Sequence, residues 1–197
     1  QKTLIFKGGT ALKKCYFGEY RFSEDLDFTI TDKNHINSHF LTDEFKKISK
    51  WIYKESGIEI PEEGLSFEEY LNPRGGTSVE GKLSYKGPNK RRGNHPRIKL
   101  DLTSDELLVN QPEAGSIYHP YSDVKETAIQ IYSIEEIFAE KLRALAERLR
   151  PRDLYDVIHL FNDKRWSPDQ KRVRSTLEKK CQYKKIPVST IKMLESS

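Results

Sequence analysis

Cysteine is scarce in this chain of 197 residues, which contains only Cys15 and Cys181. Two cysteines are too few for a disulfide framework and lack the paired spacing of a zinc site. Long apolar runs are also lacking: none approaches the roughly 20 residues that span a bilayer, and no segment resembles a signal peptide. We therefore expect two reduced thiols, no membrane association and a place in the cytoplasm.

The composition excludes two further classes of protein. Hydrophobic residues make up 36% of the chain and charged residues 32%, which is the balance of a globular protein rather than of a disordered or membrane-embedded one. A chain of this length can form one large domain or two small ones with a buried core. The net charge is only +4, so the placement of basic residues is more informative about a polyanionic partner than their total.

Two segments concentrate the basic charge. Residues 164–185 contain nine lysines and arginines against two acidic residues, and residues 86–96 contain four basic residues in a predicted hairpin loop. A solvated helical surface would explain these segments, and so would a track for a nucleic-acid backbone. The sequence leaves both interpretations open.

Periodicity divides the chain into a mixed first half and a helical second half. Alternating apolar and polar residues predict strands, whereas apolar residues at spacings of three and four predict helices. The pattern is helical from Ser133 onward, and Pro112 and Pro120 mark a boundary before it. We expect an α+β core at residues 1–125 and a helical C-terminal lobe at residues 126–197. The predicted strands of the core span residues 4–6, 25–30, 79–85 and 97–103.

One amphipathic helix is predicted within the core, at residues 38–56. It ends near Gly57 and carries an apolar face of Leu41, Phe45, Ile48 and Ile52. The following residues 57–78 are rich in Glu, Pro and Gly, and we expect them to form a loop.

Three aspartates lie on the polar faces of two predicted strands. Asp25 and Asp27 point to the same side of their strand, with Cα atoms about 7 Å apart, and Asp101 has the equivalent position in the strand at 97–103. If these strands are neighbours, three carboxylates meet, and a hard cation such as Mg²⁺ would relieve their repulsion. A solvated strand face can carry aspartates by chance, but Asp is disfavoured in strands, which favours a metal site.

A glycine turn precedes the first aspartate by about fifteen residues. Gly8 and Gly9 let the backbone bend tightly and approach a ligand, and Thr10 could cap the helix that follows. The free N–H groups of a helix N-terminus favour an anion such as a triphosphate. An ordinary capped turn between strand and helix would look the same, but the nearby aspartates favour the phosphate site.

The predicted helix at residues 134–149 has a lysine within its apolar face. Lys141 falls inside that face and Arg148 lies near it. Because a buried lysine is costly without an anion, Lys141 has two interpretations. Its role is structural, so that it extends past the edge of the core or pairs with an acid such as Asp153 or Asp156, or it holds a triphosphate. The apolar face comprises Ile134, Ile137, Phe138, Leu142, Leu145 and Leu149, and the opposite face comprises Glu136, Glu140, Arg143 and Glu147.

Five motifs follow one another between residues 4 and 161. They are Gly8-Gly9-Thr10-Ala11-Leu12, Arg21-Phe22-Ser23-Glu24-Asp25-Leu26-Asp27, Lys99-Leu100-Asp101, Glu136 to Lys141 with Ala144 and Arg148, and Arg152-Asp153-x-x-Asp156. In this order, they resemble the AbiEii/AbiGii family of nucleotidyltransferase toxins, found in type IV toxin–antitoxin and abortive-infection systems.

The resemblance implies a DNA polymerase β-like nucleotidyltransferase core, followed by a helical lobe. It also implies the use of Mg²⁺ or Mn²⁺ and an NTP, transfer of NMP to an RNA acceptor such as the 3′ end of tRNA, inhibition of translation and growth, and a cognate antitoxin encoded nearby. Asp25, Asp27 and Asp101 would hold the metal and act in catalysis with Lys141 and Asp153. Nucleotide binding would fall to Gly8, Gly9, Thr10, Ser23, Lys141 and Arg148.

Two alternatives remain open. One is a nucleotidyltransferase that acts on a small molecule or a protein side chain, and the other is a module that binds RNA or a partner without chemistry. The presence of Asp25, Asp27 and Lys141 argues against the second alternative, because a site without chemistry has no need for them.

Overall fold

The computed structural model describes residues 3–72, 75–87, 93, 95–119 and 127–186. The chain divides into two compact units: a sheet unit of residues 1–106 and 115–130, and a helical unit of residues 107–114 and 131–197. In the described ranges, no helix combines the length and the hydrophobicity that crossing a bilayer requires.

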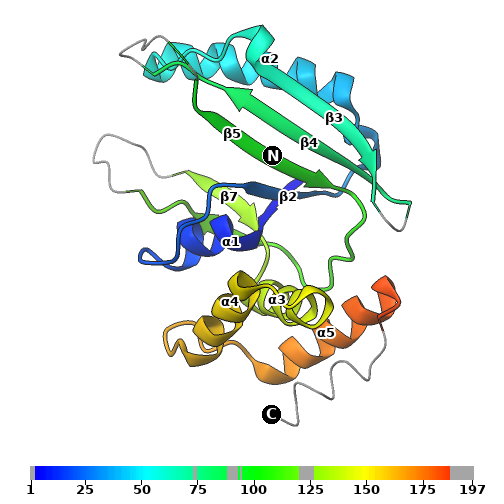
Figure 1. Ribbon diagram of the computed structural model, residues 1–197. Helices are drawn as coiled ribbons and strands as arrows, with labels where there is room; N and C mark the ends of the chain where they lie inside the picture. The colour runs from blue at the N-terminus through cyan, green and yellow to red at the C-terminus, as the bar shows by residue number, and fades with distance from the viewer. Residues whose placement is uncertain (1–2, 73–74, 88–92, 94, 120–126, 187–197) are drawn as a thin grey trace. The chain divides into compact units, whose positions relative to one another are not determined.

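A mixed seven-stranded sheet organises the first half of the chain (Figure 1). Its strands are β1 (Leu4–Lys7), β2 (Leu26–Ile30), β3 (Leu65–Leu71), β4 (Thr77–Ser84), β5 (Arg97–Thr103), β6 (Glu113–Ser116) and β7 (Ala128–Ile131). They lie in the order β3-β4-β5-β2-β1-β7-β6. β2 and β5 are parallel, whereas β1 with β2, β3 with β4 and β4 with β5 are antiparallel. The four strands that the sequence predicts are therefore confirmed as β1, β2, β4 and β5.

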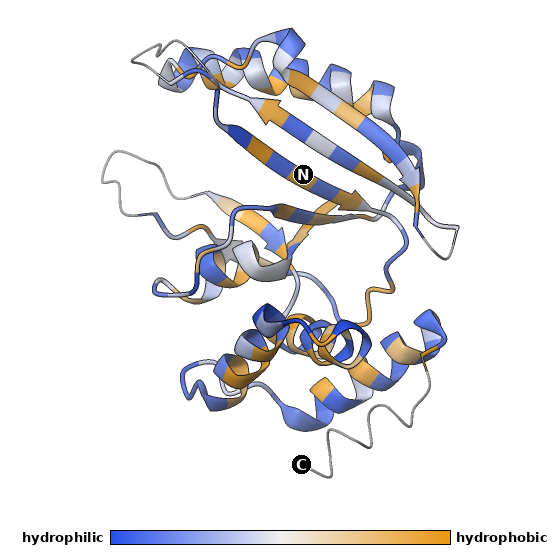
Figure 2. Ribbon diagram, viewed as in Figure 1, coloured by the Kyte–Doolittle hydropathy of each residue, from blue (hydrophilic) through white to orange (hydrophobic). Residues whose placement is uncertain are grey.

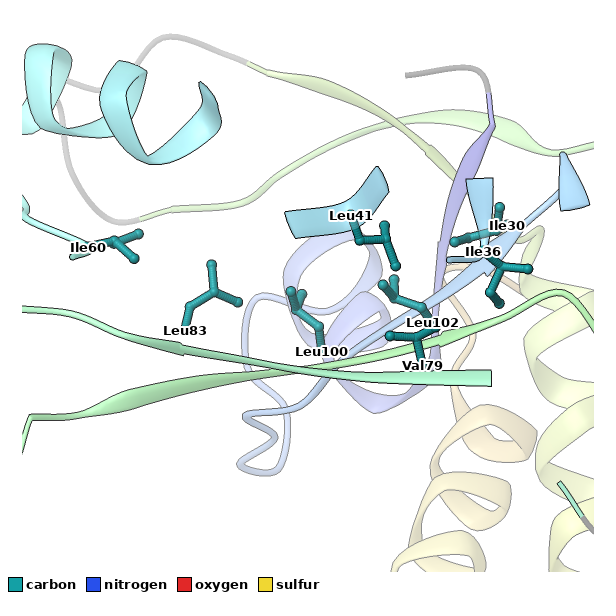
Figure 3. Packing of buried hydrophobic residues seen from close by; sticks show 8 residues of the cluster. All are labelled: Ile30, Ile36, Leu41, Ile60, Val79, Leu83, Leu100 and Leu102. Carbon is teal, nitrogen blue, oxygen red and sulfur yellow. The ribbon is translucent and has the colours of Figure 1, made fainter. Parts of the chain in front are cut away.

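The sheet has one apolar face, which packs against helix α2 (Ser38–Ser56). Apolar and polar residues alternate along β4 and β5, as Figure 2 shows. This alternation places one set of side chains under α2 and the other on the opposite face. The buried cluster comprises Ile30, Ile36, Leu41, Ile60, Val79, Leu83, Leu100 and Leu102 (Figure 3).

Helix α2 confirms the predicted helix, with one error in its apolar face. Asn37 caps the start by accepting a hydrogen bond from the Phe40 N–H, and Gly57 ends the helix in the left-handed conformation with a φ of 71°. Ile48, which we expected to face the core, is 40% exposed, and the neighbouring Ser49 is buried instead. The Ser49 hydroxyl donates to the Phe45 carbonyl at 2.7 Å, so this polar side chain is satisfied inside the helix and tolerates burial.

The prediction that residues 57–78 form a loop is wrong. They contain a short 3₁₀ turn (Glu62–Gly64) and all of β3, which pairs with β4 along its whole length, from Leu65 opposite Leu83 to Leu71 opposite Thr77. Strand β3 lies at the edge of the sheet. Its second half is exposed on both faces, so the apolar alternation that reveals a strand in the sequence is lost there.

Three helices form the helical unit: α3 (Ile134–Arg148), α4 (Pro151–Asn162) and α5 (Gln170–Lys184). The Ser133 hydroxyl caps α3 by accepting the Glu136 N–H, and α3 packs against both other helices. Leu149, which we expected on the apolar face of α3, is 79% exposed. It is the left-handed residue that ends the helix, with a φ of 48°, and this turn directs its side chain out of the helical pattern.

A buried ion pair between α3 and α5 overturns two further predictions. Glu136 was expected on the polar face of α3 and Lys180 in a basic surface, yet their side chains are 0% and 2% exposed and lie 2.6 Å apart. Glu136 also accepts the backbone N–H groups of Val109 and Asn110, and Lys180 donates to the Leu107 carbonyl at 2.9 Å. The pair therefore fixes the segment 107–110 to the helices, which periodicity within a single helix cannot reveal.

The predicted basic surface at residues 164–185 is correspondingly smaller. Lys180 and Lys184 are buried, whereas the other seven basic residues of the segment are exposed. Two of these pair with acids beside them, Arg165 with Asp163 and Arg174 with Glu178. Most of the basic loop predicted at residues 86–96 lies outside the described residues.

We expect Lys180→Met to lower the free energy of unfolding by about 3–5 kcal/mol, because it leaves the Glu136 carboxylate buried without a cation. Lys179→Met is the matched control, since Lys179 is the exposed neighbour in the same helix. Urea unfolding at pH 7 measures both variants. Equal unfolding midpoints would contradict a structural role for the buried pair.

Candidate active site

The register of the sheet gathers charged side chains in one row across four strands. Lys7 lies opposite Asp27, Asp27 opposite Asp101, and Asp101 opposite Glu80. Residues that face one another in adjacent strands direct their side chains to the same face of a sheet. Asp27 and Asp101 are therefore neighbours on the face opposite α2, and Asp25, an exposed residue, immediately precedes β2.

Lysine side chains neutralise part of this row. The ammonium group of Lys99 lies 3.4 Å from Asp101 and 3.2 Å from Glu80, and that of Lys82 lies 2.7 Å from Glu80. Hydrogen bonds from Lys82 and Lys99 lower the pKa of Glu80, so this carboxylate stays ionised. Within the described residues, no three His, Cys, Asp or Glu side chains are arranged to hold a metal ion as they stand.

The glycine turn touches the aspartate strand directly. Gly8 adopts a φ of 77°, which L side chains rarely adopt, and a Cβ atom there would lie 2.2 Å from Oδ2 of Asp27. A Cβ atom on Gly9 would lie 2.9 Å from both the guanidinium of Arg21 and the hydroxyl of Ser23. Gly8 is therefore required by its left-handed backbone and the approach of Asp27, whereas at Gly9 the ends of the Arg21 and Ser23 side chains would have to move. These approaches bring Asp27, Arg21 and Ser23 to the turn.

Thr10 does not cap the helix as expected. Helix α1 (Gly8–Ala11) begins two residues before Thr10, and no side chain caps it. It continues as a π-helix over Leu12–Tyr16. Thr10 is buried inside the helix, where its hydroxyl donates to the Asp25 carbonyl at 2.6 Å and shares a 2.9 Å hydrogen bond with Ser23. Its role is to fix the segment that carries Asp25.

Two residues near these aspartates escaped the sequence analysis. Arg21 contacts the glycine turn through its guanidinium, and Glu80 completes the row of carboxylates. Arg21 begins the motif that contains Asp25 and Asp27, and Glu80 lies on the polar side of a predicted strand. Glu80 meets Asp101 only through the pairing of β4 with β5, and Arg21 reaches the site only through the glycine turn.

A second charged cluster lies within the helical unit. Lys141 is 2.8 Å from Asp156 and 3.7 Å from Asp153, and Arg148 donates two hydrogen bonds to Asp153 at 2.7 and 2.9 Å. Burial by itself would raise the pKa of Asp153, but the hydrogen bonds from Arg148 and the charge of Lys141 outweigh it and lower that pKa. Of the two interpretations of Lys141, the structure shows pairing with both acids.

Each unit thus brings part of the predicted set together. The sheet unit brings together Gly8, Gly9, Thr10, Ser23, Asp25, Asp27 and Asp101. The helical unit brings together Lys141, Arg148 and Asp153, with Asp156 beside them.

We expect Gly8→Ala to destabilise the protein more than Gly57→Ala, although both glycines have a φ above 70°. At Gly57 nothing lies within 4 Å of a Cβ atom, so the cost is the left-handed backbone alone, about 1–2 kcal/mol. At Gly8 the clash with Asp27 adds to that cost and displaces the carboxylate. Thermal unfolding compares the two variants, and equal losses would show that position 8 does not need the close approach.

Comparisons with known proteins bear on what this arrangement is. In solved structures, the chain is similar to MenT4, described as the nucleotidyltransferase toxin Rv2826c from Mycobacterium tuberculosis H37Rv, with a TM-score of 0.58 and 22% sequence identity. The match covers 88% of this chain and 54% of that one, so the chain spans about half the length of that structure. At this identity the likeness shows the fold alone, and it confirms the expected mixed core with a helical lobe. A search of curated proteins found no significant match.

The sequence itself gives the stronger result. Residues 1–196 match the family described as "Nucleotidyl transferase AbiEii toxin, Type IV TA system", which is nearly the whole chain. Together with the aspartate row beside the glycine turn, this match shows that the chain belongs to the AbiEii nucleotidyltransferase toxin family.

Proposed function

We propose that this protein is a toxin that transfers NMP from an NTP to an RNA acceptor, such as the 3′ end of tRNA, and thereby inhibits translation and growth. The observation that carries the proposal is the pairing of Asp27 with Asp101 on adjacent parallel strands, next to a glycine turn that contacts Asp27. Carboxylates and a glycine turn in one place suit nucleotidyl transfer. Membership of the family agrees with this chemistry.

Asp25, Asp27 and Asp101 would hold Mg²⁺ or Mn²⁺. Their oxygens are hard ligands of the kind that these ions prefer, and the Lys99 ammonium 3.4 Å from Asp101 demonstrates that this carboxylate already accepts a positive charge. When bound, the ion supplies polarisation of the phosphoryl oxygens. If Asp101 binds the metal ion in place of Lys99, the Lys99 ammonium still has Glu80 as a partner at 3.2 Å.

The chain's own residues would bind the triphosphate at the turn. With no side chain at Gly8 or Gly9, the backbone there can approach phosphate oxygens closely, and the Arg21 guanidinium beside Gly9 offers charge-assisted hydrogen bonds to them. Ser23 and Thr10 hold the segment leading to Asp25 in place. The acceptor hydroxyl, assisted by Asp101, would attack the α-phosphorus; a new P–O bond forms while the bond to pyrophosphate breaks.

RNA is the acceptor that the charge distribution favours. Seven basic residues of the segment 164–185 are exposed after Lys180 and Lys184 are set aside, two of them paired with acids, and together they present positive charge to a polyanion. The antitoxin that a type IV system includes would be the protein partner, and we place the reaction in the cytoplasm.

We expect Asp27→Asn to reduce transfer more than about 100-fold, because even the outer-shell partners of metal ligands cost 10- to 100-fold when removed. The substitution keeps the shape of the side chain, so thermal unfolding should change little. The assay incubates the protein with each α-labelled NTP, Mg²⁺ and total tRNA. Asp43→Asn is the control, because Asp43 is exposed on α2.

The destination of the label separates the candidate functions. Label on tRNA supports the proposal, whereas label on a small molecule or on protein indicates a different acceptor. Absence of label from every fraction with the unmodified protein would indicate a binding module without chemistry. Full activity of Asp27→Asn would remove Asp27 from the metal site.

We further propose that Lys141 is required for transfer and does more than neutralise Asp153 and Asp156. Lys141→Met should lower both stability and activity, because it removes the cation that lies 2.8 Å from the buried Asp156 and 3.7 Å from the buried Asp153. The double variant Lys141→Met/Asp156→Asn removes one charge of each sign. We expect it to regain stability but not transfer of label; recovery of both would reduce Lys141 to a structural role.

A further inference from the structure

Phe22 is an aromatic side chain left in solvent at the edge of the proposed active site. It is 71% exposed, although both of its neighbours in sequence contact the glycine turn, Arg21 through its guanidinium and Ser23 through its hydroxyl. Three residues of extended chain span at most about 11 Å, so Phe22 lies within that distance of Asp25. The segment that carries the ring thus adjoins both the glycine turn and the aspartates.

A basic side chain lies against this ring. The ammonium group of Lys13 is 4.8 Å from the ring centroid of Phe22, within the range of a cation–π interaction. Lys13 lies in the π-helix that continues α1, and its contact with Phe22 places its ammonium group beside the segment 21–23 that reaches the glycine turn. The contact restrains the ring, while the exposed fraction shows that much of the ring surface stays accessible to a ligand.

A flat ring beside a lysine is suited to a nucleobase. Stacking on an aromatic ring accepts any base, because every base has a π-face. The Lys13 ammonium lies over the Phe22 ring, so it supports the ring from the face that a stacked base would not use. The pair therefore adds recognition of the part of a nucleotide that lies beyond its phosphates.

We propose that Phe22 and Lys13 form the subsite for the base of the incoming nucleoside triphosphate. The inference rests on the proposed function, since it takes the triphosphate to bind at Gly8 and Gly9. The base stacks on the open side of the Phe22 ring, and Lys13 holds the ring from its other side. Stacking alone favours no single base strongly, so this subsite contributes affinity for nucleotides in general.

Calorimetric titration with two ligands tests this proposal directly, with Mg²⁺ present and no acceptor. The first is each of the four NTPs, and the second is inorganic tripolyphosphate, which carries the same phosphate chain but no base. We expect Phe22→Ala to weaken NTP binding by about 5- to 150-fold and to leave tripolyphosphate binding unchanged. Phe22→Trp should keep NTP binding, with its indole fluorescence quenched when the base stacks.

Leu71→Ala is the matched control, because Leu71 is also 71% exposed but lies at the end of β3. It should leave both ligands unaffected. Loss of both ligands in Phe22→Ala would overturn the subsite, since the ring would then serve the phosphate turn, and so would loss of neither.

Two results would point elsewhere. If Phe22→Ala keeps NTP affinity but binds tRNA more weakly, the ring stacks on the acceptor and the proposed subsite is wrong. If the unmodified protein binds neither NTP nor tripolyphosphate, the nucleotidyltransferase function itself fails, which is distinct from failure of the Phe22 subsite in a protein that binds both.

Discussion

The carboxylate of Asp27 occupies the space in which any side chain at position 8 would lie, and the rest of the aspartate cluster follows from that approach. The antiparallel pairing of β1 with β2 sets Lys7 opposite Asp27, so the chain leaves β1 beside that carboxylate. Only a glycine with a φ of 77° can turn into α1 at this point. Two residues later, the Thr10 hydroxyl fixes the Asp25 carbonyl, and the parallel partner β5 brings Asp101 opposite Asp27. The approach of Gly8 to Asp27, the Thr10 hydrogen bond and the pairing of β2 with β5 thus together set the positions of three carboxylates.

The two units differ in how far their ion pairs are exposed to solvent. The paired side chains of Glu80, Lys82, Lys99 and Asp101 on the sheet keep 30–41% of their surface in solvent, and exposed ion pairs of this kind contribute only about 0–1 kcal/mol. Lys99 can therefore exchange its carboxylate partners at little cost, as a cation-binding site requires. Glu136 and Lys180, by contrast, are 0% and 2% exposed, and parting them would strand a buried charge. The exposed ion pairs on the sheet can therefore change partners, whereas the buried pair between α3 and α5 cannot.

Patterns that repeat along one element were readable from the sequence, whereas contacts between elements were not. The strands β1, β2, β4 and β5 and the helix α2 follow from alternation and capping, and the aspartates follow from their positions in two apolar strands. Strand β3 was missed because the apolar alternation is lost along an edge. Glu136 and Lys180 lie 44 positions apart in the sequence, so nothing in either helix alone indicates that they pair. Arg21 and Glu80 reach the aspartates only through the turn and the register.

Helix α4 shows most sharply why polarity does not always predict which face is buried. It buries Asp153 and Asp156, while Leu154, Tyr155, Ile158 and Phe161 are exposed. Lys141 and Arg148 offset the cost of burying the two acids. Apolar residues in the place of a buried ion cluster are often neutral or stabilising, so stability does not account for this arrangement. The buried ion cluster therefore agrees with the part proposed for Lys141 in transfer.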